Sequence, residues 1–135
     1  MHSILQALLS EVLTRAGYTA GSELELRIDP EWEPRPDVAA SLQVEHPYPT
    51  RPVDIVAEVL SPDDQMLRLH EKCEHYARIG IGKIFVFDPA SKKAWEWDRN
   101  KQNLERINAI QLANGARINL DIDIWPELDR RAQRS

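Results

Sequence analysis

V-D-I-V-A-E-V-L, residues 53–60, is an apolar run with a carboxylate, Glu58, near its end. Apolar side chains would lie on both faces of this segment, so it predicts a strand that is buried on both sides. An ionised carboxylate left unpaired in such surroundings destabilises a fold by several kcal/mol. Glu58 must therefore be neutralised, paired with a cation or bound to a metal. We favour a metal, with Asp37 upstream and Lys72 downstream as partners in the site.

The composition is that of one soluble globular domain spanning residues 1–135. Hydrophobic residues make up 42% of the chain and charged residues 29%, which is enough apolar material to bury a core without disulfide or metal staples. No segment approaches the roughly 20 consecutive apolar residues of a membrane-spanning helix. The start, M-H-S-I-L-Q, lacks the basic region and cleavage site of a signal peptide. We expect a cytoplasmic protein with no membrane association.

Cysteine and histidine usage excludes several kinds of metal centre. Cys73 is the single cysteine, so neither an internal disulfide nor a zinc site built from several cysteines can form. Its place on the face of a predicted helix indicates a packing role. His70 and His75 are five residues apart, which is not the i, i+4 spacing with which one helix presents two imidazoles to a metal.

The net charge of −5 argues against a protein that wraps nucleic acid by bulk electrostatic attraction. It leaves room for an enzyme that meets phosphate groups through a bound divalent cation, because the cation supplies local positive charge inside an acidic pocket. The glycines are dispersed along the chain, so no glycine-rich loop is available to cradle a phosphate.

The pattern of apolar residues and turn signals predicts a mixed arrangement of helices and strands. Apolar residues at helical spacing predict helices at 3–16 and from the turn at 61–64 to about residue 79, and a short helix follows at 126–135. Runs typical of strands occupy 23–28, 36–42, 53–60, 83–88, 94–97, 104–110 and 116–120. This order predicts an α/β (α+β) fold in which a mixed central sheet is flanked by helices and carries extra C-terminal strands.

Three tryptophans in the C-terminal half are candidate base-stacking platforms by residue type: Trp95, Trp97 and Trp125. Aromatic residues in strands far more often pack in the core or against a neighbouring strand, so we expect a packing role for all three. The C-terminal strands that carry Trp95 and Trp97 could also supply the interface of a homodimer.

Four short motifs in a fixed order carry a resemblance to a known family. They are P-D-V at 36–38, E-V-L-S-P at 58–62, E-K-C-E-H-Y-A at 71–77 and G-I-G-K-I-F-V-F-D-P at 80–89. Together they resemble the Uma2 family, a branch of the PD-(D/E)xK nuclease superfamily with a restriction-endonuclease-like fold. The flanking segments resemble the family only in the order of their elements.

The resemblance implies a metal-dependent endonuclease that acts on DNA, with Asp37 and Glu58 as ligands of Mg²⁺ or Mn²⁺. The usual lysine of the superfamily follows the acid by two positions, where this chain has Leu60. The Uma2 branch takes its lysine from the next helix, and the E-K-x-x-x-Y pattern maps that residue to Lys72. Family members often carry an aspartate four residues before this lysine, where Arg68 stands here.

The residue types also suit this chemistry on physical grounds. Phosphodiester hydrolysis needs a nucleophilic water, a Lewis acid for the charge on the phosphate oxygens and a path for the leaving alkoxide. Mg²⁺ prefers oxygen ligands and keeps most of its waters, so Asp37, Glu58 and a substrate phosphate suffice to hold it. Lys72 would orient or activate the attacking water and stabilise negative charge in the transition state.

Three other interpretations stay open. Lys72 could simply neutralise a partly buried Glu58 in a structural ion pair, with Asp37 capping a turn after Pro36. The domain could be a catalytically inactive nuclease fold that binds a protein or nucleic-acid partner, which the acidic net charge and Arg68 favour. Hydrolysis of another phosphate ester is also compatible with these residues.

Overall fold

The computed structural model describes residues 1–134 and leaves Ser135 outside the described part. One helix and three strands are followed by a second helix, further strands, a π-helical turn and a C-terminal helix. In chain order the elements are α1 (His2–Arg15), β1 (Thr19–Ser22), β2 (Val38–Ser41), β3 (Ile55–Val59), α2 (Met66–Arg78), β4 (Lys83–Asp88), β5 (Lys93–Asp98), β6 (Asn103–Ile107), β7 (Ala109–Gln111), β8 (Arg117–Asn119), the π-helical turn η1 (Leu120–Ile124) and α3 (Trp125–Arg134).

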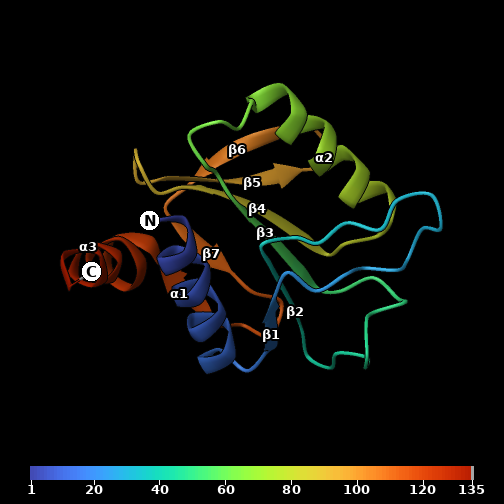
Figure 1. Cartoon of the computed structure of the whole chain (residues 1–135), viewed down its shortest axis with the longest axis horizontal. Helices are drawn as coiled ribbons and strands as arrows, with labels where there is room; N and C mark the ends of the chain where they lie inside the picture. Colours follow the sequence, from blue (N-terminus) through green and yellow to red (C-terminus); the bar gives the residue numbers. More distant parts are fainter. Residues whose placement is uncertain (135) are drawn as a thin grey trace.

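A six-stranded mixed sheet in the order β1-β2-β3-β4-β5-β6 forms the centre of the fold (Figure 1). β3 and β4 are parallel, whereas the other neighbouring strands are antiparallel. A parallel pair needs a crossover connection, and α2 provides it. β7 and β8 form a separate two-stranded sheet that shares an apolar cluster with α1 and α3. The predicted mixed sheet with flanking helices and extra C-terminal strands is therefore confirmed.

β3 is the middle of the core, because all of its residues are buried. Val56 belongs to a cluster on one face of the sheet, together with Cys73 and Tyr76 of α2. Successive side chains of a strand point to opposite faces, so Glu58, two residues after Val56, lies on this same face. The alternate residues of β3 pack on the other face against four leucines of α1: Leu5, Leu8, Leu9 and Leu13.

The segment 23–28 is not the strand that its alternating pattern predicts. The first strand is β1, at residues 19–22, and it pairs with β2. Residues 23–28 run instead beside proline-containing loops: the amide of Leu26 donates to the carbonyl of Pro34, and the amide of Arg27 donates to that of Pro49. Because proline has no N–H to return, a regular ladder cannot form there.

Two further boundaries differ from the prediction. The run 104–110 is divided between β6 and β7, which belong to different sheets. The break falls at Asn108, whose carbonyl accepts a hydrogen bond from the amide of Leu120. α2 begins at Met66 rather than in the turn at 61–64, where Asp64 accepts hydrogen bonds from the amide and the hydroxyl of Ser61.

The single cysteine and the three tryptophans pack as expected. Cys73 is fully buried, and Trp97 and Trp125 are 5% and 6% exposed. Trp95 is partly buried and packs against the apolar cluster that Val56 shares with Cys73 and Tyr76. Of the two tryptophans considered for a homodimer interface, Trp95 therefore has the larger exposed surface.

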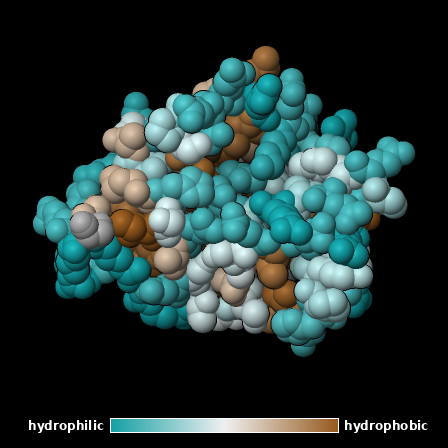
Figure 2. Space-filling model, viewed as in Figure 1, coloured by the Kyte–Doolittle hydropathy of each residue, from teal (hydrophilic) through white to brown (hydrophobic). Residues whose placement is uncertain are grey.

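The surface seen in Figure 2 is mainly hydrophilic, and its hydrophobic residues form small, separate patches. The large hydrophobic residues with the most exposed surface are Met1, Leu42, Met66, Leu67 and Ile122. Within residues 1–134, no helix combines the length and the apolar character needed to cross a bilayer.

Gly82 lies where β4 begins beside β3, and the backbone leaves no room for a side chain there. A Cβ atom on Gly82 would lie 2.6 Å from the carbonyl oxygen of Asp54. We expect Gly82→Ala to lower the free energy of unfolding by about 1–3 kcal/mol, as overpacking commonly does, in urea denaturation. Gly21→Ala is the control, since its Cβ would meet only the movable side chain of Leu24. An unchanged free energy in Gly82→Ala would contradict the packing argument.

Candidate active site

The register of the sheet brings two acids together at one end of the central strands. The antiparallel pairing of β2 with β3 places Val38 opposite Ala57, and one step further along this register places Asp37 level with Glu58. The Asp37 carboxylate is fixed against β3, because its Oδ2 accepts a hydrogen bond of 2.6 Å from the amide of Val59. Two acids that are distant in the sequence thus lie at one edge of the sheet.

Glu58 is only 6% exposed, and α2 supplies two partners for its side chain. Its Oε1 accepts a hydrogen bond of 2.7 Å from the hydroxyl of Tyr76 and lies 2.9 Å from Nζ of Lys72. Lys72 and Tyr76 are four residues apart, so they share one face of the helix. The Lys72 side chain remains 38% exposed, as expected for a long stem that lies on the helix and delivers its ammonium group to the sheet.

Burial raises the pKa of the Glu58 carboxyl above that of an ordinary glutamate, and the negative charge of Asp37 adds to the rise. The charge of Lys72 and the hydrogen bond from Tyr76 act in the opposite direction without cancelling the effect of burial. Burial and the charge of Glu58 also raise the pKa of Tyr76, so its hydroxyl stays a donor at neutral pH. A buried carboxylate whose charge is only partly offset is typical of functional sites.

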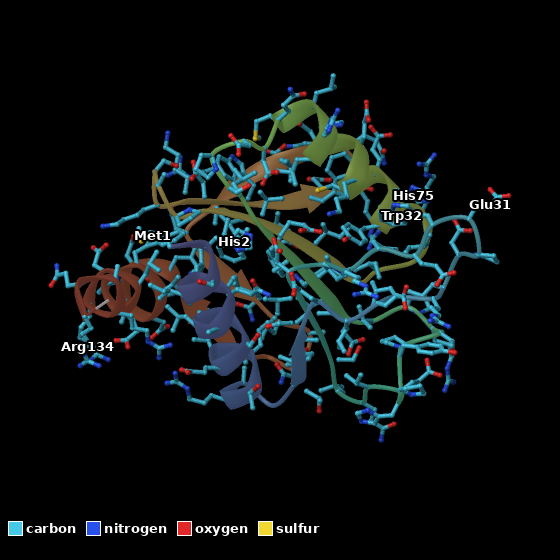
Figure 3. The ribbon with its side chains drawn as sticks, viewed as in Figure 1. Met1, His2, Glu31, Trp32, His75 and Arg134 are labelled. Carbon is cyan, nitrogen blue, oxygen red and sulfur yellow. The ribbon has the colours of Figure 1, made fainter. Side chains whose placement is uncertain are left out.

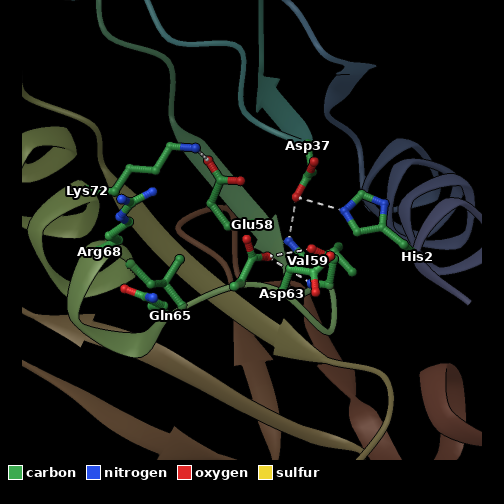
Figure 4. A pocket seen from close by; sticks show the side chains of 11 residues that line it. His2, Asp37, Glu58, Val59, Asp63, Gln65, Arg68 and Lys72 are labelled. Carbon is green, nitrogen blue, oxygen red and sulfur yellow. Dashed lines mark hydrogen bonds and ion pairs between the residues drawn. The ribbon is translucent and has the colours of Figure 1, made fainter.

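Asp37, Glu58 and Lys72 line one cavity of about 450 Å³ (Figure 4). Arg68 lies one helical turn before Lys72 on α2, and both side chains lie on the same side of the pocket in Figure 4. Within residues 1–134 the Arg68 side chain makes no hydrogen bond or ion pair, so it is available to an anionic ligand. The complete lining is His2, Asp37, Glu58, Val59, Ser61, Asp63, Asp64, Gln65, Arg68, Leu69 and Lys72.

The pocket gathers the three residues predicted from the sequence and adds others that the sequence did not indicate. His2 lies with its Nε2 3.4 Å from Oδ2 of Asp37, and no local pattern predicts that the start of α1 reaches this edge of the sheet. Tyr76 carries a detectable signal, because it stands four residues after Lys72 in the E-K-x-x-x-Y motif. The motif was used only to assign Lys72, whereas the structure shows that the tyrosine hydroxyl also contacts Glu58.

The structural ion-pair interpretation describes part of this geometry. Lys72 does contact Glu58, and Asp37 does bind a backbone amide, although the amide belongs to Val59 of β3 rather than to a turn after Pro36. The contacts of Glu58 use Oε1, and those of Asp37 use Oδ2. In the part of the chain that the structure describes, the second oxygen of each carboxylate makes no hydrogen bond. Each acid thus retains an oxygen for a cation.

The donor set fits Mg²⁺ or Mn²⁺ better than a metal that needs many protein ligands. Among residues 1–134, no group of three or more His, Cys, Asp or Glu side chains is arranged to hold a metal ion. Mg²⁺ keeps several of its waters and needs only one or two carboxylates together with a substrate phosphate. Asp37 and Glu58 meet this smaller requirement.

Comparison with known proteins identifies the family. The chain matches the profile of Uma2, a family described as “Putative restriction endonuclease”, over residues 1–127. It belongs to the Uma2 family. The resemblance carried by the four motifs is thereby confirmed, and the match extends it to both flanks of the motif region. No curated protein matches the sequence.

This Uma2 protein is also similar to a solved structure, the crystal structure of a “putative nuclease belonging to DUF820” from Anabaena variabilis. The TM-score is 0.69 at 18% sequence identity, and the likeness covers 94% of this chain and 81% of that one. At this level of identity the comparison concerns the fold, and it confirms the mixed α+β architecture.

A buried charge that its partners only partly offset should destabilise the metal-free Uma2 protein at neutral pH. We expect Glu58→Gln to raise the midpoint of thermal unfolding at pH 7 in EDTA, since Lys72 is exposed enough to be solvated alone. The pKa of Glu58 is raised in the folded state, so folding favours the protonated side chain. The stability gained in this way is fully present below the unfolded-state pKa of Glu58 and is lost as the pH rises through its folded-state pKa. The difference in unfolding midpoint between Glu58→Gln and the wild type should therefore become smaller as the pH is lowered.

Glu71, an exposed acid on the same helix, provides the control for this measurement. Glu71→Gln should leave the midpoint nearly unchanged at either pH. A marked loss of stability in Glu58→Gln would show instead that the ion pair with Lys72 holds the fold together.

Proposed function

We propose that this Uma2 protein is a nuclease that depends on a divalent cation and hydrolyses phosphodiester bonds in DNA. The observation that carries the proposal is the convergence of two acids and a lysine, Asp37, Glu58 and Lys72, in one pocket at the edge of the sheet. The family profile and the fold of the solved relative support the same class of activity. A cytoplasmic location is part of the proposal.

Asp37 and Glu58 would hold Mg²⁺ or Mn²⁺ through the carboxylate oxygens that accept no hydrogen bond from residues 1–134. When bound, the cation supplies a Lewis acid for the phosphate oxygens and lowers the pKa of a coordinated water. The amide of Val59 keeps Asp37 oriented, and Tyr76 does the same for Glu58. Both carboxylates are therefore fixed before a cation arrives, which reduces the entropy lost on binding.

Lys72 is placed to act on the substrate as well as on Glu58. Its ammonium lies at the pocket and is partly exposed, so it can orient the attacking water and stabilise the negative charge that grows on the phosphate oxygens. Arg68, one turn away, presents a guanidinium that makes no hydrogen bond or ion pair with residues 1–134, and a planar guanidinium suits a phosphate group. The positive charges of Lys72 and Arg68 partly offset the acidic net charge of the protein at the pocket, where the substrate would approach.

A second candidate function is a catalytically inactive module that keeps the nuclease fold and binds a partner. The contact between Lys72 and Glu58 favours it, because this pair partly neutralises the site without any metal. The two functions differ in whether the pocket takes up a divalent cation, and this can be measured without any activity assay.

We expect Mn²⁺ to bind the wild-type protein and to raise its midpoint of thermal unfolding in proportion to the logarithm of its concentration above the dissociation constant. Asp37→Asn and Glu58→Gln should each abolish the shift, whereas Glu71→Gln should retain it. Isothermal titration with Mn²⁺ checks the same point directly. The absence of heat and of a thermal shift in the wild type would favour the inactive module.

We expect the wild type to cleave plasmid DNA or labelled oligonucleotides with Mg²⁺ or Mn²⁺. Asp37→Ala, Glu58→Ala and Lys72→Ala should each reduce the single-turnover rate by about 100-fold or more, as loss of a group that positions or stabilises the transition state commonly does. Lys101→Ala, in an exposed turn that does not line the pocket, is the control and should cleave normally. Equal rates in all four variants, or no cleavage by the wild type with either metal, would refute the enzymatic proposal.

A further inference from the structure

A second hollow adjoins the catalytic pocket and shares His2, Ser61 and Asp64 with it. Its volume is about 830 Å³, within the usual range for sites that accept small organic groups. The loop before α2 and the connection from β4 to β5 form its walls. Its apolar lining consists mainly of Met1, Leu60, Pro62, Met66, Pro89 and Trp95.

The sheet register places Trp95 in the same row as the catalytic carboxylate. Glu58 is paired with Val86 on β4, and Val86 is paired with Trp95 on β5. Paired residues on neighbouring strands point to the same face, so the indole and the carboxylate lie on one side of the sheet, two strand spacings or about 10 Å apart. A nucleotide whose phosphate is held at Glu58 could thus place its base near Trp95.

Several residues that line the hollow are more exposed to solvent than core residues are. Trp95 is partly buried, whereas Trp97, two residues along the same strand, is 5% exposed. Met66 is 49% exposed and Met1 is 50% exposed, so two thioethers border the hollow beside the indole. Figure 3 labels Met1 and His2, which lie together at the start of α1. The hollow therefore offers an aromatic platform with adaptable, polarizable walls.

Acids and cations both border this apolar surface. Asp64 and Asp88 line the hollow, and Asp88 is the cross-strand neighbour of Lys93. Lys93 lines the hollow, and Arg106 is the cross-strand neighbour of Trp95 on β6. Within residues 1–134 neither side chain makes an ion pair or a hydrogen bond. A flat apolar surface next to unpaired cations is the combination that binds a base together with its flanking phosphates.

We propose that this hollow is a nucleobase subsite, in which Trp95 stacks on a base next to the phosphate held at Asp37 and Glu58. The inference deepens the proposed function and depends on it for the position of that phosphate. A base in an intact duplex is already stacked and paired, and its extrusion costs a few kcal/mol. The subsite therefore selects single-stranded DNA, or a strand whose bases are already unstacked, over continuous duplex DNA.

The test uses a single-stranded oligonucleotide with one 2-aminopurine, titrated with the full-length chain in Ca²⁺ and checked on a gel for intact DNA. Stacking on an indole should quench the 2-aminopurine fluorescence, and a continuous duplex with the same label should bind more weakly. Trp95→Ala should abolish the quenching and weaken binding by about 5- to 150-fold, the range that corresponds to the loss of one base–aromatic stack. Trp95→Phe should restore most of the affinity.

Met66 and Leu67 provide a matched pair that avoids the risk of unfolding. Both are exposed residues at the start of α2, but only Met66 lines the hollow. Met66→Ala should weaken binding to the single strand, whereas Leu67→Ala should not. Thermal unfolding of each variant verifies that it is folded.

The outcomes separate this inference from the proposed nuclease activity. Cleavage by the wild type, with binding unaffected in both Trp95→Ala and Met66→Ala, would overturn the subsite and leave the nuclease proposal intact. Quenching that depends on Trp95 in a protein that cleaves nothing would support the base-binding surface and refute the enzyme. Equal or tighter binding of the continuous duplex, or no binding of the wild type to single strands, would also overturn the subsite.

Discussion

The burial of one negative charge on β3 shapes the site of this Uma2 protein. Glu58 belongs to a strand that is buried on both faces, and α2 places Lys72 and Tyr76 against it. These partners offset the charge only in part, because burial still raises the pKa of the carboxyl. The parallel pairing of β3 and β4 requires the crossover through α2, and the contacts with Glu58 account for a lysine and a tyrosine one turn apart on the face of this helix. The partial offset also leaves an acidic site that a divalent cation would stabilise.

The antiparallel and parallel pairings of the sheet determine what surrounds this charge. The β2–β3 register brings Asp37 beside Glu58, and the β3–β4–β5 register continues the row through Val86 to Trp95. Acids therefore lie at one end of the row and an indole at the other, with cations of α2 and β5 near each. Val86 itself is fully buried, so a bound strand would pass from the carboxylates to the indole where the two hollows adjoin, at His2, Ser61 and Asp64.

Much of the fold could be predicted from the sequence because length and composition distinguish the central segments. The runs at 53–60 and 83–88 are too short for typical helices, are rich in β-branched or aromatic residues and lie next to prolines, so they favour buried strands. The apolar stripe of α2 indicates the face of the helix that meets them. The strand predicted at 23–28 was wrong because the segment does alternate polar and apolar residues, but the carbonyls that accept its hydrogen bonds belong to prolines. No local sequence pattern reveals these partners. Hydrogen bonds to segments distant in the sequence therefore outweighed the preference of residues 23–28 for a regular strand.

Part of the candidate site could also be predicted from the sequence. Glu58 stands out because an ionised group in an apolar run destabilises the fold unless it has a partner, whereas the roles of Asp37 and Lys72 follow from the resemblance of their motifs to the Uma2 family. The approach of His2 to Asp37 depends on how the start of α1 packs beside the sheet, which spacing along the chain does not encode. The hollow at Trp95 likewise arises from three segments far apart in the sequence, so residue type alone favoured a packing role for this tryptophan.

The central claim is that Asp37 and Glu58 together hold a divalent cation, and a crystal of the protein soaked in Mn²⁺ tests it most directly. Data collected at a wavelength where manganese scatters anomalously locate the ion without reference to the protein density. We predict one strong anomalous peak in the pocket, within about 2.0–2.3 Å of an oxygen from each of the two carboxylates. A pocket without a peak, with Lys72 still paired to Glu58, or a peak held by other side chains, would contradict the account.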